Sequence, residues 1–238
     1  MALGWENRMQ ARSYDQAAID AGLRQYMLSI YNYMTIGLAI TGVVAFMVAQ
    51  SPEAMHVIFG TPLKWVVMLA PLGFVFLFAA RIHTMTAATA QMVFWAFAAV
   101  MGLSMASIFM VFTGTSIARV FFITASAFGA TSLYGYTTKA DLTKMGSFMF
   151  MGLIGIVLAS LVNIFLASSA LQFAISVIGV VVFVGLTAYD TQRLKEVYAE
   201  GYDQDSLGRI KIMGALTLYL DFINLFTMLM QLFGSSRD

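Results

Sequence analysis

Long stretches without a single Asp, Glu, Lys or Arg constrain the fold of this chain more than any other feature. They cover residues 25–52, 82–118, 120–138 and 145–189, and Asp221 is the only charged residue within 212–236. About 18 or more apolar residues are enough for a helix to cross the ~30 Å hydrocarbon core of a membrane. The strict alternation of a membrane β-barrel is absent, so helices are the spanning structure that remains. The sequence therefore predicts an all-α polytopic membrane protein.

Seven transmembrane helices account for these stretches. We expect crossings at residues 27–49, 62–80, 88–111, 116–137, 146–166, 170–190 and 213–233. The run 145–189 is too long for one crossing, and its polar break at Asn163 and Ser168–Ser169 predicts a short hairpin on the outside. The expected organisation is a cytoplasmic N-terminal segment (1–26), a seven-helix transmembrane domain (27–234) and a C-terminal tail (235–238).

Basic residues gather on one side of the predicted membrane. Of the 13 Lys and Arg residues, all but Lys64, Arg119 and Arg237 lie in the N-terminal segment or in the connections after the second, fourth and sixth crossings. Cytoplasmic loops of membrane proteins are enriched in Lys and Arg. This asymmetry predicts a cytoplasmic N-terminus and a C-terminus on the outside.

Two aspartates occupy positions where a membrane-spanning chain tolerates few charges. Asp190 closes the sixth crossing, and Asp221 interrupts the seventh. A charged carboxylate at the centre of a membrane helix costs at least about 2.5 kcal/mol, so an ionisable residue there is a functional-site hypothesis. Both positions belong to the cytoplasmic half of the bundle. We expect the two carboxyl groups to share one proton, because two adjacent carboxylates cannot both ionise cheaply.

Polar residues follow one stripe of the last helix. Thr217, Asp221, Asn224 and Gln231 are separated by steps that place them on one helical face. We expect Thr217, Asn224 and Gln231 to line a pore or cavity beside Asp221. The alternative is a structural role, in which the stripe supplies hydrogen bonds between helices.

Two arginines are candidate partners of the aspartates. Arg193 follows Asp190 by one helical turn, so Asp190 is alternatively an interfacial carboxylate paired with Arg193. Arg81 ends the second crossing on the cytoplasmic side. Its ordinary role would be that of a positively charged anchor, and its functional role would be to compete with Asp221 for Asp190.

Several classes of function are disfavoured by the composition. The chain has no cysteine, which removes thiol catalysis and Cys-based metal sites, and His56 and His83 fall on opposite sides of the predicted membrane. A net charge of +1 argues against nucleic acid as a partner. Phosphate-binding motifs are absent, so nucleotide-driven pumping is not expected. We therefore expect no enzymatic activity and no cofactor.

Three stretches resemble the transmembrane Bax inhibitor motif family. They are SLYGYTTKADLTKMGSFMFMGLIG (132–155), GLTAYDTQRLK (185–195) and ALTLYLDFINLFTMLMQLFG (215–234). The sequence Leu-Asp-Phe-Ile-Asn-Leu-Phe in the last stretch is the most specific of these motifs. The SLYGYTT version is similar to bacterial members, which implies a multi-pass protein of the bacterial inner membrane.

The resemblance also implies a fold and a function. The family's last helix is central and surrounded by the other six. Its members form a pH-sensitive calcium leak, in which the matching residues would be Asp190 and Asp221 as proton sensor and Arg81 as latch. Carboxylate and amide oxygens suit Ca²⁺, so Asp190 and Asp221 would contact the permeant ion weakly and transiently.

Two alternatives of other classes stay open. Bacterial members of the family are associated with a membrane-anchored protease of the FtsH type, so the chain is alternatively a non-conducting regulator of such a protease. A more remote alternative is an intramembrane aspartyl protease, because that class also uses two aspartates on adjacent helices. Asp221, however, lies in Tyr-Leu-Asp rather than Gly-x-Gly-Asp, and no Pro-Ala-Leu follows.

Overall fold

A computed structural model describes the backbone of residues 3–199 and 204–237. Within these residues the regular structure is helical, apart from an isolated antiparallel bridge between Phe112 and Ser236. The elements are α1 (Leu3–Ala49), α2 (Pro52–Phe59), α3 (Leu63–Arg81), the 3₁₀ turn η1 (Ile82–Thr84), α4 (Ala87–Met105), α5 (Ile108–Val111), α6 (Gly114–Thr137), α7 (Thr143–Leu166), α8 (Ser169–Ala199) and α9 (Gln204–Phe233).

Seven helical segments of the described chain are long and apolar enough to cross a membrane. They are Asp20–Ala49, Leu63–Thr84, Ala87–Val111, Gly114–Thr137, Thr143–Leu166, Ser169–Tyr198 and Ser206–Phe233. Each overlaps one predicted crossing, so the all-α fold with seven membrane helices is confirmed. Large apolar side chains on the outside, such as Phe76 and Phe165, are 73% and 89% exposed, which is the pattern expected where lipid replaces water.

The hairpin between α7 and α8 falls where the polar break predicted it. α7 ends at Leu166, and Ala167 follows in the left-handed conformation (φ 47°) common after helix ends. The Asn163 Oδ1 atom accepts the backbone N–H of Ser168, and its amide nitrogen donates to Gln172 Oε1 of α8. Asn163 therefore fastens the turn and joins the two helices.

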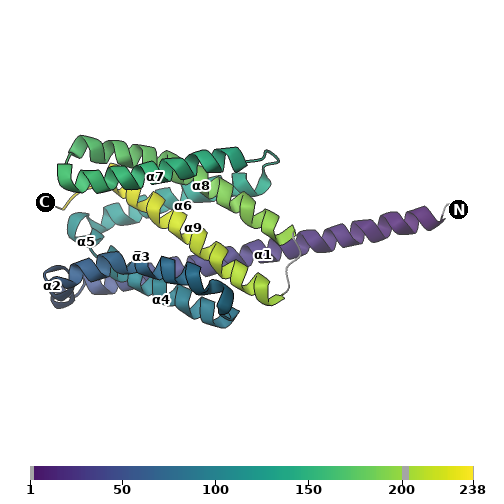
Figure 1. Cartoon of the computed structure of the whole chain (residues 1–238), viewed down its shortest axis with the longest axis horizontal. Helices are drawn as coiled ribbons and strands as arrows, with labels where there is room; N and C mark the ends of the chain where they lie inside the picture. Colours follow the sequence, from purple (N-terminus) through teal and green to yellow (C-terminus); the bar gives the residue numbers. More distant parts are fainter. Residues whose placement is uncertain (1–2, 200–203, 238) are drawn as a thin grey trace.

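Two membrane helices extend further at one end than the predicted crossings. α1 is helical from Leu3, and in Figure 1 its N-terminal part projects beyond the rest of the bundle. The amphipathic sequence 192–211 predicts an extension of the sixth crossing followed by a turn near Gly201, and α8 does continue to Ala199. The turn expected near Gly201 lies outside the described residues.

The last helix is the most buried of the seven. In its most apolar stretch of 18 residues, 67% of the residues are buried. The corresponding stretches of the other six membrane helices are 11–39% buried. Figure 1 shows α9 passing obliquely between a group formed by α1, α3 and α4 and a group formed by α6, α7 and α8. Its close packing is with α1, α4, α6 and α8, whereas α3 packs mainly on α4 and α7 mainly on α8. We expected the last helix to be surrounded by all six others. In the structure α9 packs closely against four of them.

A C-terminal strap, residues 235–237, ties the end of α9 to the corner between α5 and α6. The backbone N–H of Thr113 donates to the Ser235 carbonyl, and that of Arg237 donates to the Val111 carbonyl. The Ser116 hydroxyl oxygen accepts the Ser235 N–H, and the Arg237 guanidinium donates to the Phe109 carbonyl. These bonds satisfy backbone groups that the ends of α5 and α9 leave free.

Candidate functional site

The two aspartates predicted to act together share one cavity. Asp190 lies on α8 and Asp221 on α9, and these helices pack closely along each other. The cavity has a volume of about 600 Å³ and opens beside the two carboxyl groups. Its polar lining consists of Ser147, Tyr189, Asp190, Arg193, Thr217, Asp221 and Asn224. A cavity of this size could hold water or a hydrated ion next to the pair.

The carboxyl groups of Asp190 and Asp221 lie close enough to interact with each other. Asp221 is buried, with 5% of its surface exposed, while Asp190 is half-buried. In the part of the chain that the structure describes, no amide, hydroxyl or amine donates to Asp221 Oδ2. A hydrogen bond between two carboxyl groups requires a proton on one of them. A hydrogen bond between Asp190 and Asp221 would therefore need one proton shared by the two groups.

Two glycines let neighbouring helices approach the turn that carries Asp190. A Cβ atom at Gly146 of α7 would collide with the ring of Tyr189, the residue before Asp190. A Cβ atom at Gly135 of α6 would collide with the backbone carbonyl of Ala188. Close backbone approach needs residues without a side chain, as is common between membrane helices. These contacts hold the turn of α8 in place against α6 and α7.

The structure separates the two candidate arginines. Arg193 lines the cavity one turn after Asp190 and lies close enough to act on its carboxylate electrostatically. Arg81 is exposed at the end of α3 and does not line this cavity. The structure therefore brings Arg193, and not Arg81, to the aspartate pair.

The polar stripe of α9 divides between two environments. Thr217 and Asn224 line the cavity beside Asp221, and their donors bond to carbonyl groups of their own helix. Gln231 does not line this cavity. Its Oε1 atom instead accepts from Gln172 of α8 and lies 2.6 Å from the Ser176 hydroxyl. Gln231 thus contributes to an interhelical hydrogen-bond cluster at the hairpin end of α8.

Residues next to Asp190 make contacts that sequence reasoning missed. Thr191 is fully buried, and its hydroxyl lies 2.9 Å from that of Ser132 on α6. Gln192 accepts the backbone N–H of Leu142 and donates to the Ala140 carbonyl. The signal was present as a run of hydrogen-bonding residues, Asp-Thr-Gln, inside an apolar helix. These contacts connect the turn of α8 to α6 and to the α6–α7 connection.

The oxygen atoms at the pair fit a transient rather than a resident cation. Within the described residues no group of three or more His, Cys, Asp or Glu side chains is placed to hold a metal ion. Calcium takes about 6–8 oxygen ligands. Two carboxyl groups and the side-chain oxygen of Asn224 supply a minority of these, so water would provide the others.

The fold and the site define a class: polytopic membrane proteins with an ionisable pair buried between two helices. A family model described as "Inhibitor of apoptosis-promoting Bax1" matches residues 23–238. The chain therefore belongs to the Bax inhibitor family, as the three sequence stretches predicted.

Bacterial proteins are similar to this chain over almost its whole length. Protein RP147 of Rickettsia prowazekii is 50% identical over 219 residues, covering 92% of this chain and 93% of the relative. The inner membrane protein YbhL of Escherichia coli K12 is 49% identical over 220 residues, covering 91% and 94%. A Borreliella burgdorferi protein is 40% identical over 216 residues, covering 90% and 93%.

Proposed function

We propose that this protein is a passive calcium leak of the bacterial inner membrane, gated by the proton that Asp190 and Asp221 share. The observation that carries the proposal is the Asp221 carboxyl group, which is buried, lines a cavity and faces another carboxyl group instead of a donor. An ionisable residue in a membrane helix that faces a cavity is typical of ion pathways and proton relays. The similarity to an inner membrane protein supports the location.

The gate works through competition for Asp190. While the pair holds its proton, Asp190 bonds to Asp221 and the helices stay closed. Loss of the proton leaves two adjacent anions, which repel strongly in a medium of low dielectric constant. Asp190 then turns towards an arginine, and the cavity widens beside the polar stripe of α9. The loss of one proton is enough to shift the protein from the closed to the open state if the free energies of these two states differ by only a few kcal/mol.

Calcium passes as a permeant ion and not as a bound cofactor. Asp190, Asp221 and the Asn224 amide offer hard oxygen ligands along one side of the cavity. A small number of ligands favours conduction, because an ion must bind weakly enough to leave. Flow follows the calcium gradient, since no motif for nucleotide-driven transport is present in the sequence.

The test is calcium flux into proteoliposomes between about pH 6 and about pH 8. Wild-type flux should rise with pH across this range. Asp221→Asn keeps a hydrogen bond to Asp190 but removes the charge repulsion, so its flux should change less than about twofold over the same range. A wild-type protein without flux at any pH would contradict the proposal.

Asp141 provides a matched control for this test. It lies outside the membrane-spanning segments, and hydrogen bonds from the side chain and backbone of Thr143 hold the pKa of its carboxyl below the usual value. Asp141 therefore stays ionised throughout the range of the assay and cannot produce a pH response there. Asp141→Asn should keep the wild-type profile. A flattened profile in this control would show that any loss of an acidic residue has the same effect.

A further inference from the structure

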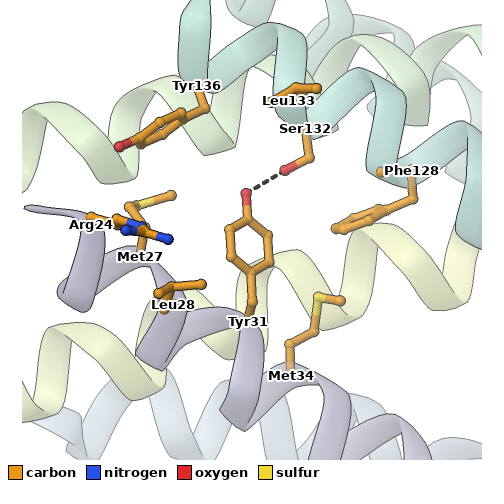
Figure 2. A pocket seen from close by; sticks show the side chains of 10 residues that line it. Arg24, Met27, Leu28, Tyr31, Met34, Phe128, Ser132, Leu133 and Tyr136 are labelled. Atoms are coloured by element: carbon orange, nitrogen blue, oxygen red, sulfur yellow. Dashed lines mark hydrogen bonds between the residues drawn. The ribbon is translucent and has the colours of Figure 1, made fainter.

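A groove between α1 and α6 is separate from the aspartate cavity. It has a volume of about 590 Å³, within the range of small-molecule sites. Figure 2 shows Arg24 and Tyr136 at one end and Met34 and Phe128 at the other. Its walls are almost entirely apolar, apart from Arg24 and the hydroxyl groups of the tyrosines and Ser132. The groove is thus long, apolar and charged at one end.

The mouth of the groove faces outward from the bundle. Leu28 of α1 and Leu133 of α6 stand at this mouth and are 51% and 62% exposed. Both lie within membrane-spanning segments. An occupant of the groove would therefore enter sideways from the hydrocarbon core, and not from water.

Basic side chains gather at one end of the groove. Arg24 lines this end of the groove and is exposed. A second cation lies nearby, because Lys195 of α8 donates to the backbone carbonyl of Tyr136. Both basic residues lie at the end of the bundle that the distribution of Lys and Arg predicts to be cytoplasmic. Phosphate oxygens complement such a pair of donors.

We propose that this groove binds one anionic phospholipid of the leaflet at that end, with an acyl chain against Met27, Met34 and Phe128 and the phosphate at Arg24. An acyl chain fills an apolar groove that opens towards hydrocarbon. The negatively charged phosphate complements Arg24 and Lys195. Basic pockets between membrane helices on the cytoplasmic side are suited to lipid headgroups.

The groove wall is connected to the aspartate site through hydrogen bonds. The hydroxyl group of Tyr31, which points across the groove, lies 2.5 Å from that of Ser132, and Ser132 bonds in turn to Thr191. Thr191 directly follows Asp190. A bound lipid would therefore contact a side chain two hydrogen bonds away from the turn that carries Asp190. Binding itself does not depend on the proposed calcium leak.

The groove offers a blocking variant with a matched control. Gly129 lines the groove, and a Cβ atom placed there meets nothing within 4 Å, so Gly129→Phe fills the groove without forcing the helices apart. Gly155 of α7 has equally open space and does not line the groove, so Gly155→Phe is the control. Arg24→Gln removes the headgroup contact alone.

The experiment is native mass spectrometry of the full chain released from vesicles of equal parts phosphatidylglycerol and phosphatidylcholine, with oleate added in a second series. Wild type and Gly155→Phe should retain phosphatidylglycerol in preference to phosphatidylcholine. Gly129→Phe should lose this retention, and Arg24→Gln should reduce the preference by about fivefold.

Three outcomes would overturn the lipid site. They are equal retention of the two phospholipids by wild type, undiminished phosphatidylglycerol retention by Gly129→Phe, and an unchanged preference in Arg24→Gln. Displacement of phosphatidylglycerol by oleate would also overturn it, because the site would then bind a fatty acid. If Gly129→Phe does not fold, Arg24→Gln decides the question, since Arg24 is exposed on the surface.

Discussion

At the scale of single residues, the proposed gate depends on which arginine Asp190 can reach. The family resemblance assigns the role of latch to Arg81, yet Arg81 is exposed at the end of α3. Arg193 already lines the cavity on the same helix as Asp190. An arginine on another helix would draw the Asp190 carboxylate away from Asp221. An arginine on the same helix as Asp190 would only hold that carboxylate where it already lies.

Substituting each arginine separates these two roles. If Arg81 is the latch, Arg81→Gln should hold the protein closed and lower calcium flux at about pH 8 by roughly tenfold, which corresponds to ~1.4 kcal/mol. Arg193→Gln should then keep a clear rise of flux with pH. The measurement is proteoliposome flux for both variants. The reverse result, with a flat profile only in Arg193→Gln, would assign the latch to Arg193.

The residues of the site were predictable to different extents. Thr217, Asp221 and Asn224 share a face because the geometry of one helix fixes their directions, and sequence spacing reports that geometry. Spacing does not report which neighbour covers a given turn, so it grouped Gln231 with the cavity residues although Gln231 bonds to Gln172. The position of Arg81 relative to Asp190 depends on how separate helices pack. That packing leaves no periodic signal in the sequence.

At the scale of elements, the contact between α6 and α8 depends on Gly135. The described structure has no room for a Cβ atom there, since the Ala188 backbone occupies the space. A backbone cannot move aside as a flexible side chain does. The positions of the seven membrane helices were predictable from apolar runs and polar breaks, although α1 and α8 extend beyond the predicted crossings. The close approach of two helices at Gly135 was not predictable, since other helical glycines of the described chain, such as Gly42 and Gly73, meet no neighbour.

Gly135→Ala should therefore destabilise the protein by about 1–3 kcal/mol, the usual cost of overpacking. The extra methyl group must push α8 away from α6 beside the aspartate pair. The thermal unfolding midpoint of the purified protein measures the effect. Gly155→Ala is the control, because a Cβ atom at Gly155 meets nothing within 4 Å, and its midpoint should not fall. Equal midpoints for the two variants would show that the contact at Gly135 adapts without cost.

At the scale of the whole molecule, orientation in the membrane determines what the site can sense. If all seven candidate helices cross the membrane, the two termini lie on opposite sides. The basic residues predict that the aspartate pair faces the cytoplasmic half. Its proton would then report cytoplasmic pH, and the leak would respond to the interior of the cell.

Reporter fusions test this orientation. A reporter enzyme that is active only outside the cytoplasm should be active when fused after Asp238 and inactive when fused after Ala140. The reason is that residue 140 lies in the connection between α6 and α7, on the side richer in Lys and Arg. Activity of the fusion at residue 140 would reverse the predicted orientation, and the pair would then face the outside.

The C-terminal strap restricts how α9 can move. Residues 235–237 are bonded to the corner between α5 and α6, so the far end of α9 is fastened. Asp221 lies 14 residues before Ser235, or about 21 Å along the helix at ~1.5 Å per residue. These bonds oppose a translation of α9 along its own axis. If α9 moves, it would swing about this fastened end, and the largest displacement would fall at its N-terminal end, beyond Asp221.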